Sequence, residues 1–255
     1  MTGSIHLDRQ DRVATLTVDR APLNILDLAA LDELRGMIET LTADSAIQLL
    51  VIKGGGSKAF SAGVAVQDHT PDKIEGMLES FHAVLRLLLE FPAPTLAAIQ
   101  GHCLGGGMEL AAACDLRFAA AKSSFGQPEI QLGCYPPWAA AHYPALLGPG
   151  VTADLLLTGR IIDSAEASEI GFVDRRVDDD RLEAEVAGFS SQVTAQSAAV
   201  TRLAVRAIRA HRGLNFEQAL TESERLYTEE LTQTHDMNEG LSAFLDKRAP
   251  NWQHR

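Results

Sequence analysis

An apolar strand, a glycine triplet and an apolar helix occur in this order between residues 95 and 113. The run 95–99 predicts a buried strand, and the triplet 105–107 allows a tight turn directly into a helix over 108–113. Gly106 would then lie at the helix N-terminus, where its N–H is a free donor that a ligand oxygen can approach closely. Such a fixed donor suits an oxyanion that forms only during a reaction.

Two glutamates, Glu109 and Glu129, lie in segments that are otherwise apolar or built of small residues. Isolated carboxylates are seldom placed in such segments for solubility, although Glu109 alone would fit a structural carboxylate paired with an arginine. Two carboxyl groups in one dry site cannot easily both ionise, so one should have a raised pKa and start protonated. We expect Glu109 to be the one that stays ionised, because it lies near a helix N-terminus.

Composition limits the classes of protein to which the chain can belong. Its 255 residues, 46% of them hydrophobic, are enough for one large core or a domain with an appendage. The formal net charge of −12 argues against binding to a nucleic-acid backbone as the main function. The three cysteines, Cys103, Cys114 and Cys134, form no CxxC pair, so neither a zinc ribbon nor a disulfide framework is indicated and no metal is expected.

The first ten residues lack the basic and apolar regions of a signal peptide, and no apolar run approaches the roughly 20 residues of a spanning helix. We therefore expect a soluble, cytoplasmic protein with reduced thiols.

Hydrophobic periodicity predicts strands alternating with helices in the first part of the chain and helices alone in the last part. The predicted strands are 4–7, 12–18, 47–52, 95–99, 116–119, 124–125 and 172–177. The predicted helices are 28–41, 71–91, 108–113, 139–147, 151–157, one beginning at 163, and then 181–193, 198–210, 216–230 and 238–247. This pattern indicates an α/β core domain over 1–179 and a helical region over 180–255 that packs on the core or on a neighbouring subunit.

Six segments resemble motifs of the crotonase family, also called the enoyl-CoA hydratase/isomerase family, and they occur in family order from end to end. They are Lys58-Ala-Phe-Ser-Ala-Gly63, Gln100-Gly-His-Cys-Leu-Gly-Gly-Gly-Met-Glu-Leu110, Cys114-Asp115, Phe125-Gly-Gln-Pro-Glu-Ile130, Leu157-Thr-Gly-Arg160 and Gly240-Leu-Ser-Ala-Phe-Leu-Asp-Lys-Arg248. The resemblance implies a ClpP-like spiral of ββα repeats whose C-terminal helices form trimers, often paired as hexamers. It also implies an acyl-CoA thioester as substrate, with coenzyme A present only as part of that substrate and no separate cofactor.

The resemblance assigns roles to particular residues. The backbone N–H groups of Val64 and Gly106 would hold the thioester oxygen, and two preformed donors suit the enolate-like oxyanion of the family reactions. Glu109 would orient and deprotonate the water that attacks C3, and Glu129 would deliver or remove the proton at C2. Ala62 belongs to the segment around the first of these donors and is assigned to the substrate site.

Further residues are assigned to substrate binding by resemblance, and each also has an ordinary explanation. Lys58, Lys247 and Arg248 would contact CoA phosphates or adenine, with the last two reaching the ligand of a neighbouring subunit, but all three also fit simple surface charges. Where the family usually has a glycine whose N–H supports the catalytic carboxylate, this chain has Pro137, which has no N–H. Trp138 could reshape the pocket for a flat or cyclic acyl group, or simply begin a helix.

These residues lead to the hypothesis of a lyase that adds water reversibly to an α,β-unsaturated acyl-CoA. Within the family the chain looks most like the cyclohexa-1,5-diene-1-carbonyl-CoA hydratase branch. Because Pro137 disturbs the hydratase pattern, double-bond isomerisation and thioester hydrolysis stay as alternatives, and so does a non-catalytic CoA-binding assembly subunit. The acyl group, the direction in the cell and the choice between trimer and hexamer stay open at this point.

Overall fold

A six-stranded sheet forms the centre of the computed structural model, which describes residues 4–255. Its strands, in spatial order, are β1 (Ile5–Gln10), β2 (Val13–Val18), β3 (Leu49–Gly54), β5 (Thr95–Ile99), β7 (Leu116–Ala120) and β10 (Arg175–Val177). The predicted hairpin β1–β2 is antiparallel, and all other neighbours are parallel. All five residues of β5 are buried, as expected for a strand covered on both faces.

A second sheet contains β4 (Ala59–Ser61), β6 (His102–Leu104), β8 (Ser124–Gly126) and β9 (Ile161–Asp163). The strands β4, β6 and β8 each follow a central strand in the sequence, so successive turns of the chain add one strand to each sheet. No strand was predicted between 95–99 and the glycine triplet, whereas in the structure the chain turns from β5 into β6 there. Gly101 allows the turn between β5 and β6, because its φ is +74° and a Cβ atom there would lie 2.2 Å from the Lys58 carbonyl oxygen.

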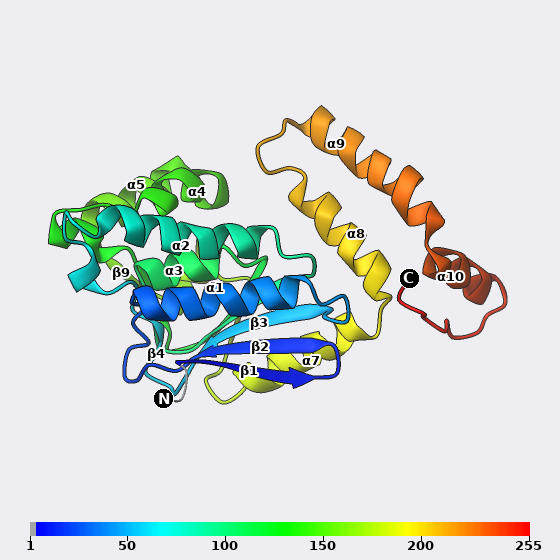
Figure 1. Cartoon of the computed structure of the whole chain (residues 1–255), viewed down its shortest axis with the longest axis horizontal. Coiled ribbons are helices and arrows are strands. Elements are labelled where there is room, and N and C mark those ends of the chain that lie inside the picture. Colours follow the sequence, from blue (N-terminus) through cyan, green and yellow to red (C-terminus); the bar gives the residue numbers. More distant parts are fainter. Residues whose placement is uncertain (1–3) are drawn as a thin grey trace.

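Helices cover one side of the central sheet (Figure 1). They are α1 (Leu28–Thr42), α2 (Ile74–Leu89), α3 (Gly106–Ala112), α4 (Pro137–Leu147), α5 (Pro149–Thr158) and α6 (Ser164–Glu169), with the 3-10 turns η1 (Val66–Asp68) and η2 (Pro128–Leu132). The apolar stripes of α1 and α2 point into the main core, and every residue of the short helix α3 is buried.

The other face of the central sheet is covered by α7 (Leu182–Thr194). Its residues Leu182 and Phe189 form a second apolar cluster with residues of β3, β5 and β7, and the Phe189 ring meets Phe118 edge-on at 5.4 Å. The first helix of the predicted region 180–255 therefore packs on the core.

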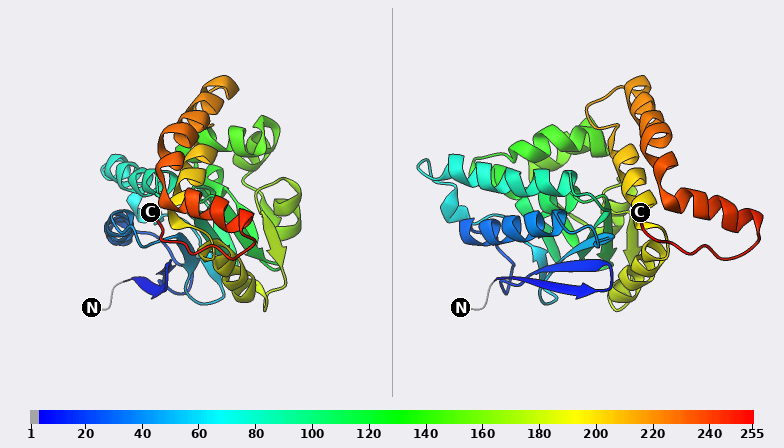
Figure 2. Two further views of the ribbon diagram at one scale, coloured as in Figure 1. Left: turned by 90° about the vertical axis from the view of Figure 1, so that its right-hand side faces the viewer. Right: turned by 45° about the vertical axis from the view of Figure 1, so that its right-hand side comes forward.

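The remaining helices form an arm that extends away from the two sheets (Figures 1 and 2). The arm contains α8 (Ala198–Arg209), α9 (Phe216–Arg225), a π-helical turn η3 (Leu226–Glu230), a 3-10 turn η4 (Leu231–Gln233) and α10 (His235–Leu245). The division of the chain at 179/180 stays a prediction. None of the helices between residues 4 and 255 is long and apolar enough to cross a membrane.

Candidate active site

Glu109 lies on α3 with its carboxyl group in the interior, and the residue is only 4% exposed. Its Oε1 atom accepts a hydrogen bond of 2.8 Å from the backbone N–H of Ala139. That N–H is available because Ala139 is the third residue of α4, within the first turn, where backbone donors have no intrahelical acceptor. Pro137, which has no N–H to offer, takes the first helical position, and the donor to the carboxylate lies two residues further on.

Glu129 lies in the 3-10 turn η2, and its carboxyl group sits directly over Gly105. A Cβ atom on Gly105 would be 2.5 Å from Glu129 Oε1, and Gly105 has a φ of +53°. Both facts require glycine at this position. The glycine triplet thus makes room for the second carboxylate as well as for a ligand.

Burial raises the pKa of both carboxyl groups. The pKa of Glu109 is raised to about 8, mainly by burial and further by the charge of Glu129, against the opposing effect of the Ala139 hydrogen bond. Burial likewise raises the pKa of Glu129 to about 7. One group was expected to hold its proton at neutral pH, with Glu109 as the member that stays ionised. Burial raises the pKa of both groups by similar amounts, so this order of ionisation stays a prediction.

The backbone N–H groups of Val64 and Gly106 lie next to each other. A Cβ atom on Gly106 would be 3.3 Å from Val64 N, and one on Gly63 would be 3.1 Å from Gly106 N. Among residues 4–255, neither of the two N–H groups makes a turn or loop hydrogen bond to the backbone, and Gly106 begins α3, so it has no intrahelical acceptor. A single oxygen atom could accept from both.

The structure places Ala62 and Gly63 immediately before Val64, between β4 and the bridge that pairs Val64 with Leu26. Lys58 is exposed beside β4, at the start of the same segment.

Trp138 lies in the first turn of α4, next to the residue that holds Glu109, and its half-buried ring stacks on His142 at 4.3 Å. Lys247 and Arg248 are exposed at the far end of the arm, where Arg248 is paired with Glu239. Within one chain they are not brought together with the two carboxylates (Figure 1).

Sequence reasoning missed three groups that contact the carboxylates or their neighbours. The Ala139 N–H could have been found by placing the start of α4 at Pro137 rather than at 139. The buried side chains of Gln127 and Tyr143 hydrogen-bond to each other beside Glu129. Gln127 lies in a matched motif, whereas nothing in the sequence around Tyr143 distinguishes it from a core residue.

Among the residues that the structure describes, no three His, Cys, Asp or Glu side chains are arranged to hold a metal ion. The site presents carboxyl groups and backbone donors, an arrangement suited to moving protons beside a stabilised oxyanion.

A model of the enoyl-CoA hydratase/isomerase family matches residues 8–255. The chain belongs to this family, as its motifs indicated. The crotonase fold is confirmed by solved structures: an enoyl-CoA hydratase from Bacillus anthracis has a TM-score of 0.94 at 29% identity and covers 99% of this chain and 100% of its own. An enoyl-CoA hydratase from Mycobacterium smegmatis has a TM-score of 0.93 at 26% identity, covering 98% of each chain.

Two relatives with named activities align along nearly the full length. The cyclohexa-1,5-dienecarbonyl-CoA hydratase of Thauera aromatica is 39% identical over 251 residues, covering 98% of this chain and 96% of its own. The crotonyl-CoA hydratase of Syntrophomonas wolfei is 32% identical over 254 residues, covering 98% and 97%. The first of these similarities agrees with the predicted branch of the family.

Proposed function

We propose that this protein is an enoyl-CoA hydratase that adds water reversibly to the double bond of an α,β-unsaturated acyl-CoA. The observation that carries the proposal is the pair of buried carboxyl groups beside two adjacent backbone N–H donors. Family membership identifies CoA thioesters as the substrates. We propose that coenzyme A enters only as part of them.

The proposed reaction assigns each group one task. The thioester oxygen accepts from the N–H groups of Val64 and Gly106, which stabilise the enolate that forms when a nucleophile adds at C3. Ionised Glu109 takes one proton from water while the water oxygen bonds to C3, and protonated Glu129 gives its proton to C2. The substrate has then gained one H₂O, and the proton on Glu109 must return to Glu129 to complete the cycle.

The free site contains the two states that this reversible reaction requires. With pKa values raised to about 8 and about 7, the two carboxyl groups share protons around neutral pH instead of both being ionised. A site with one proton on Glu109 is ready for dehydration, and a site with that proton on Glu129 is ready for hydration. The bond from Ala139 to Glu109 supports a hydratase over the isomerase and hydrolase alternatives, because it holds the carboxylate assigned to the water.

For the acyl group we propose a flat, cyclic dienoyl thioester. This proposal rests on similarity to the Thauera aromatica enzyme and on Trp138, which lies one residue from the amide that holds Glu109. Lys58 would bind the CoA end of the substrate. Lys247 and Arg248 would do so only across a subunit contact, which fits a trimer or a dimer of trimers acting in the cytoplasm.

The test is mass spectrometry of the purified protein incubated with a panel of linear enoyl-CoAs and cyclic dienoyl-CoAs. Gain of one water by the cyclic substrate supports the full proposal. Hydration of crotonyl-CoA alone would retain the hydratase and exclude the cyclic specificity. Double-bond migration without water uptake, release of free CoA, or no turnover of any thioester would each exclude hydration as the activity.

A further inference from the structure

Gln127 lies fully buried between Glu129 and the hydroxyl group of Tyr143, which is also fully buried. When the amide nitrogen faces Glu129, it is 3.1 Å from Oε2 and 3.2 Å from Oε1, and the amide oxygen accepts from the Tyr143 hydroxyl at 2.7 Å. This arrangement satisfies an ionised Glu129, because a carboxylate can only accept hydrogen bonds. The amide then acts as a donor to the carboxylate.

The reversed amide suits the other protonation state of the same carboxyl group. Its nitrogen then donates to the Tyr143 oxygen at 2.7 Å, and its oxygen faces Glu129. Two acceptors would face each other unless Glu129 carries a proton, in which case the carboxylic acid donates to the amide oxygen. The two orientations differ by a half turn about the last side-chain bond and fill the same volume.

Tyr143 is suited to both orientations because a hydroxyl group can donate or accept. Its ring packs against Phe172 and Trp138, at centroid distances of 6.2 and 6.4 Å, and phenylalanine would fill this space equally well. Among the described residues its hydroxyl group bonds only to Gln127. The hydroxyl group therefore contributes a hydrogen bond to the Gln127 amide and is not needed for the packing of the core.

We propose that Gln127 and Tyr143 are positioning residues for Glu129, and that reversal of the Gln127 amide lets this buried pair hydrogen-bond to Glu129 both as a carboxylate and as an acid. The inference rests on the proposed function, in which Glu129 alternates between these states. Each catalytic cycle would then contain one amide reversal when Glu129 loses its proton and another when it regains it.

The other groups that face Glu129 do not provide an equivalent donor. Glu109 on α3 adds negative charge, Cys134 after η2 donates to the Glu129 backbone oxygen, and the Glu129 backbone N–H interacts with its own carboxyl group. On α5, which packs beside η2, Asp154 is already paired with Arg160. Gln127 is thus the side chain placed to stabilise the charge on Glu129.

The experiment follows the protonation of Glu129 directly by infrared spectroscopy across a pH titration, with Glu129→Gln used to assign its bands. Gln127→Met keeps the shape and removes the amide. We expect this variant to raise the pKa of Glu129 by about one pH unit. It removes both the charge-assisted bond from the amide to the carboxylate and the bond from the carboxylic acid to the amide, and the charge-assisted bond is the stronger. Tyr143→Phe should raise that pKa by less. In Gln127→Met the C=O band of protonated Glu129 should also move to higher wavenumber, since the acid loses its acceptor.

Two matched variants serve as controls. Gln48→Met removes a buried amide that bonds to Val193 and Gln196 at the end of α7, and Tyr227→Phe removes an exposed hydroxyl. Neither should shift the Glu129 titration. An unshifted pKa in Gln127→Met would overturn the positioning role, and an unshifted C=O band would overturn the reversal.

This readout separates the inference from the proposed function, because it needs no turnover. Shifted bands in a protein that hydrates no thioester would retain the hydrogen-bonded chain and exclude the hydratase. If the protein is active, Gln127→Met should displace the pH dependence of kcat by the same amount and change KM little, a split that loss of packing alone would not produce.

Discussion

At Glu109, burial raises the pKa of the carboxyl group by more than the hydrogen bond from Ala139 lowers it. Because its pKa rises from 4.5 in the unfolded chain to about 8 in the folded one, folding favours the protonated form. The contribution of the protonated Glu109 side chain to the stability of the fold is therefore complete below about pH 4.5 and is lost as the pH rises to about 8. At pH 8, Glu109→Gln should therefore unfold at a higher temperature than wild type, because its free energy of unfolding is larger by on the order of a few kcal/mol. Near pH 4.5 the two proteins should unfold at the same temperature.

Differential scanning calorimetry across this pH range checks the prediction. Glu33→Gln is the control of opposite sign, because hydrogen bonds from Ser4 outweigh the effect of burial and lower the pKa of Glu33. That variant should lose stability at neutral pH. A Glu109→Gln variant that is no more stable than wild type at pH 8 would show that the carboxyl group is not held protonated.

Replacing either carboxyl group should abolish most of the activity. Glu109→Gln and Glu129→Gln should each lower kcat at least about a hundredfold, the usual scale for a lost acid or base. Binding of CoA, measured by calorimetry, should change little, since neither side chain is assigned to the CoA moiety. A variant that retains a near-normal rate would remove that residue from the mechanism.

Gly106 is the position where one added methyl group should separate the two backbone donors. Its Cβ atom would lie 2.9 Å from Val64 Cγ2 and 3.1 Å from Phe81 Cζ, so one of the neighbours must move. We expect Gly106→Ala to lower kcat/KM about a hundredfold, the scale for a displaced oxyanion donor. Gly36→Ala on α1, which meets nothing within 4 Å, is the control and should be neutral or slightly stabilising. Equal rates in both variants would contradict the oxyanion assignment.

At this scale the sequence identified both glutamates and the glycine triplet, because their residue types are unusual in apolar segments. It did not identify Ala139, whose contribution is a backbone N–H that any residue but proline carries, because the helix was predicted to begin at 139 and not at Pro137. It predicted a raised pKa for one carboxyl group, whereas burial raises the pKa of both, because the depth of burial depends on the fold in three dimensions.

Helix α8 connects the arm to the core through buried charges. Arg209, at its last turn, pairs with Asp115 and donates to the backbone oxygens of Phe91 and Ala93. Burial alone would raise the pKa of Asp115, but the bonds from Arg209 and Thr95 lower it below its usual range. Asp115 thus forms an anchor between α8 and β5.

Removing Arg209 should leave Asp115 buried without its main partner. Arg209→Ala should destabilise the fold by about 3 kcal/mol or more in chemical denaturation. Arg206→Ala, one turn earlier, removes an exposed pair with Glu230 and should have little effect. If the two variants are equally stable, the anchor has no energetic importance.

The elements that the sequence missed share one physical property. β4, β6 and β9 have three residues each, too few for an alternating pattern to be recognised, and they exist because the second sheet pairs them across long sequence separations. The longer elements, such as α1, β3 and β5, agree with their predicted ranges within a few residues, since each carries a full period of buried side chains.

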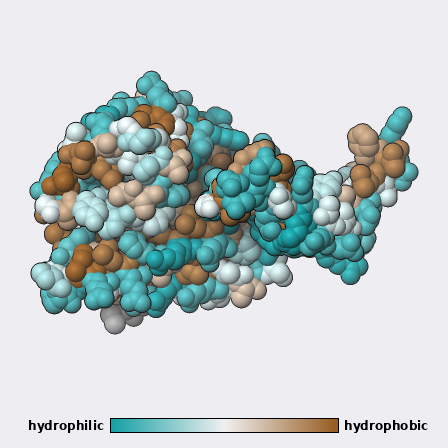
Figure 3. Space-filling view, turned by 90° about the horizontal axis from the view of Figure 1, so that it is seen from above, coloured by the Kyte–Doolittle hydropathy of each residue, from teal (hydrophilic) through white to brown (hydrophobic). Residues whose placement is uncertain are grey.

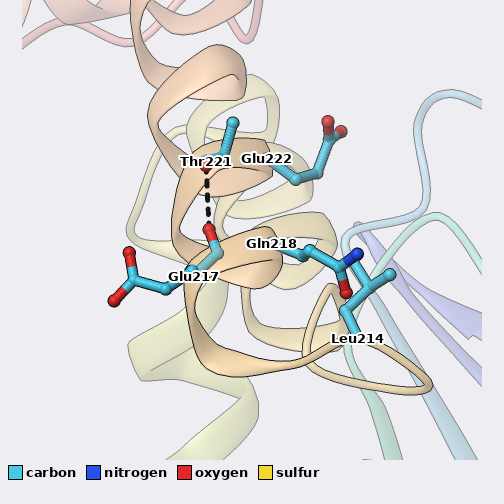
Figure 4. A pocket seen from close by; sticks show the side chains of 5 residues that line it. All are labelled: Leu214, Glu217, Gln218, Thr221 and Glu222. Atoms are coloured by element: carbon cyan, nitrogen blue, oxygen red, sulfur yellow. Dashed lines mark hydrogen bonds between the residues drawn. The ribbon is translucent and has the colours of Figure 1, made fainter.

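In the whole molecule, apolar residues are exposed where the arm projects furthest. Phe244 and Leu245 of α10 are 82% and 78% exposed, and Figure 3 shows apolar residues gathered at the end of the arm. Elsewhere on the arm, the first turns of α9 carry an open hollow lined by Leu214, Glu217, Gln218, Thr221 and Glu222, in which the Thr221 hydroxyl donates to the Glu217 carbonyl (Figure 4). A surface of this kind is expected to be covered in an assembly.

We expect the wild-type protein to sediment as a trimer or hexamer, and Phe244→Glu to reduce that mass by placing a charge in the subunit contact. Analytical ultracentrifugation at several protein concentrations measures the effect. Leu157→Glu is the matched change on α5, distant from the arm, and should leave the trimer intact. A monomeric wild type, or a variant with unchanged mass, would contradict a role for α10 in assembly.

The bond from Ala139 to Glu109 has a consequence for how such an enzyme can evolve. Because the carboxylate is held by the main chain, residues at the start of α4 can be exchanged without removing the donor, as long as position 139 is not proline and stays small enough for its buried site. Neighbouring positions such as Pro137 and Trp138 are thereby free to vary with the substrate. New acyl specificities could arise by drift in this segment while the proton chemistry is inherited unchanged.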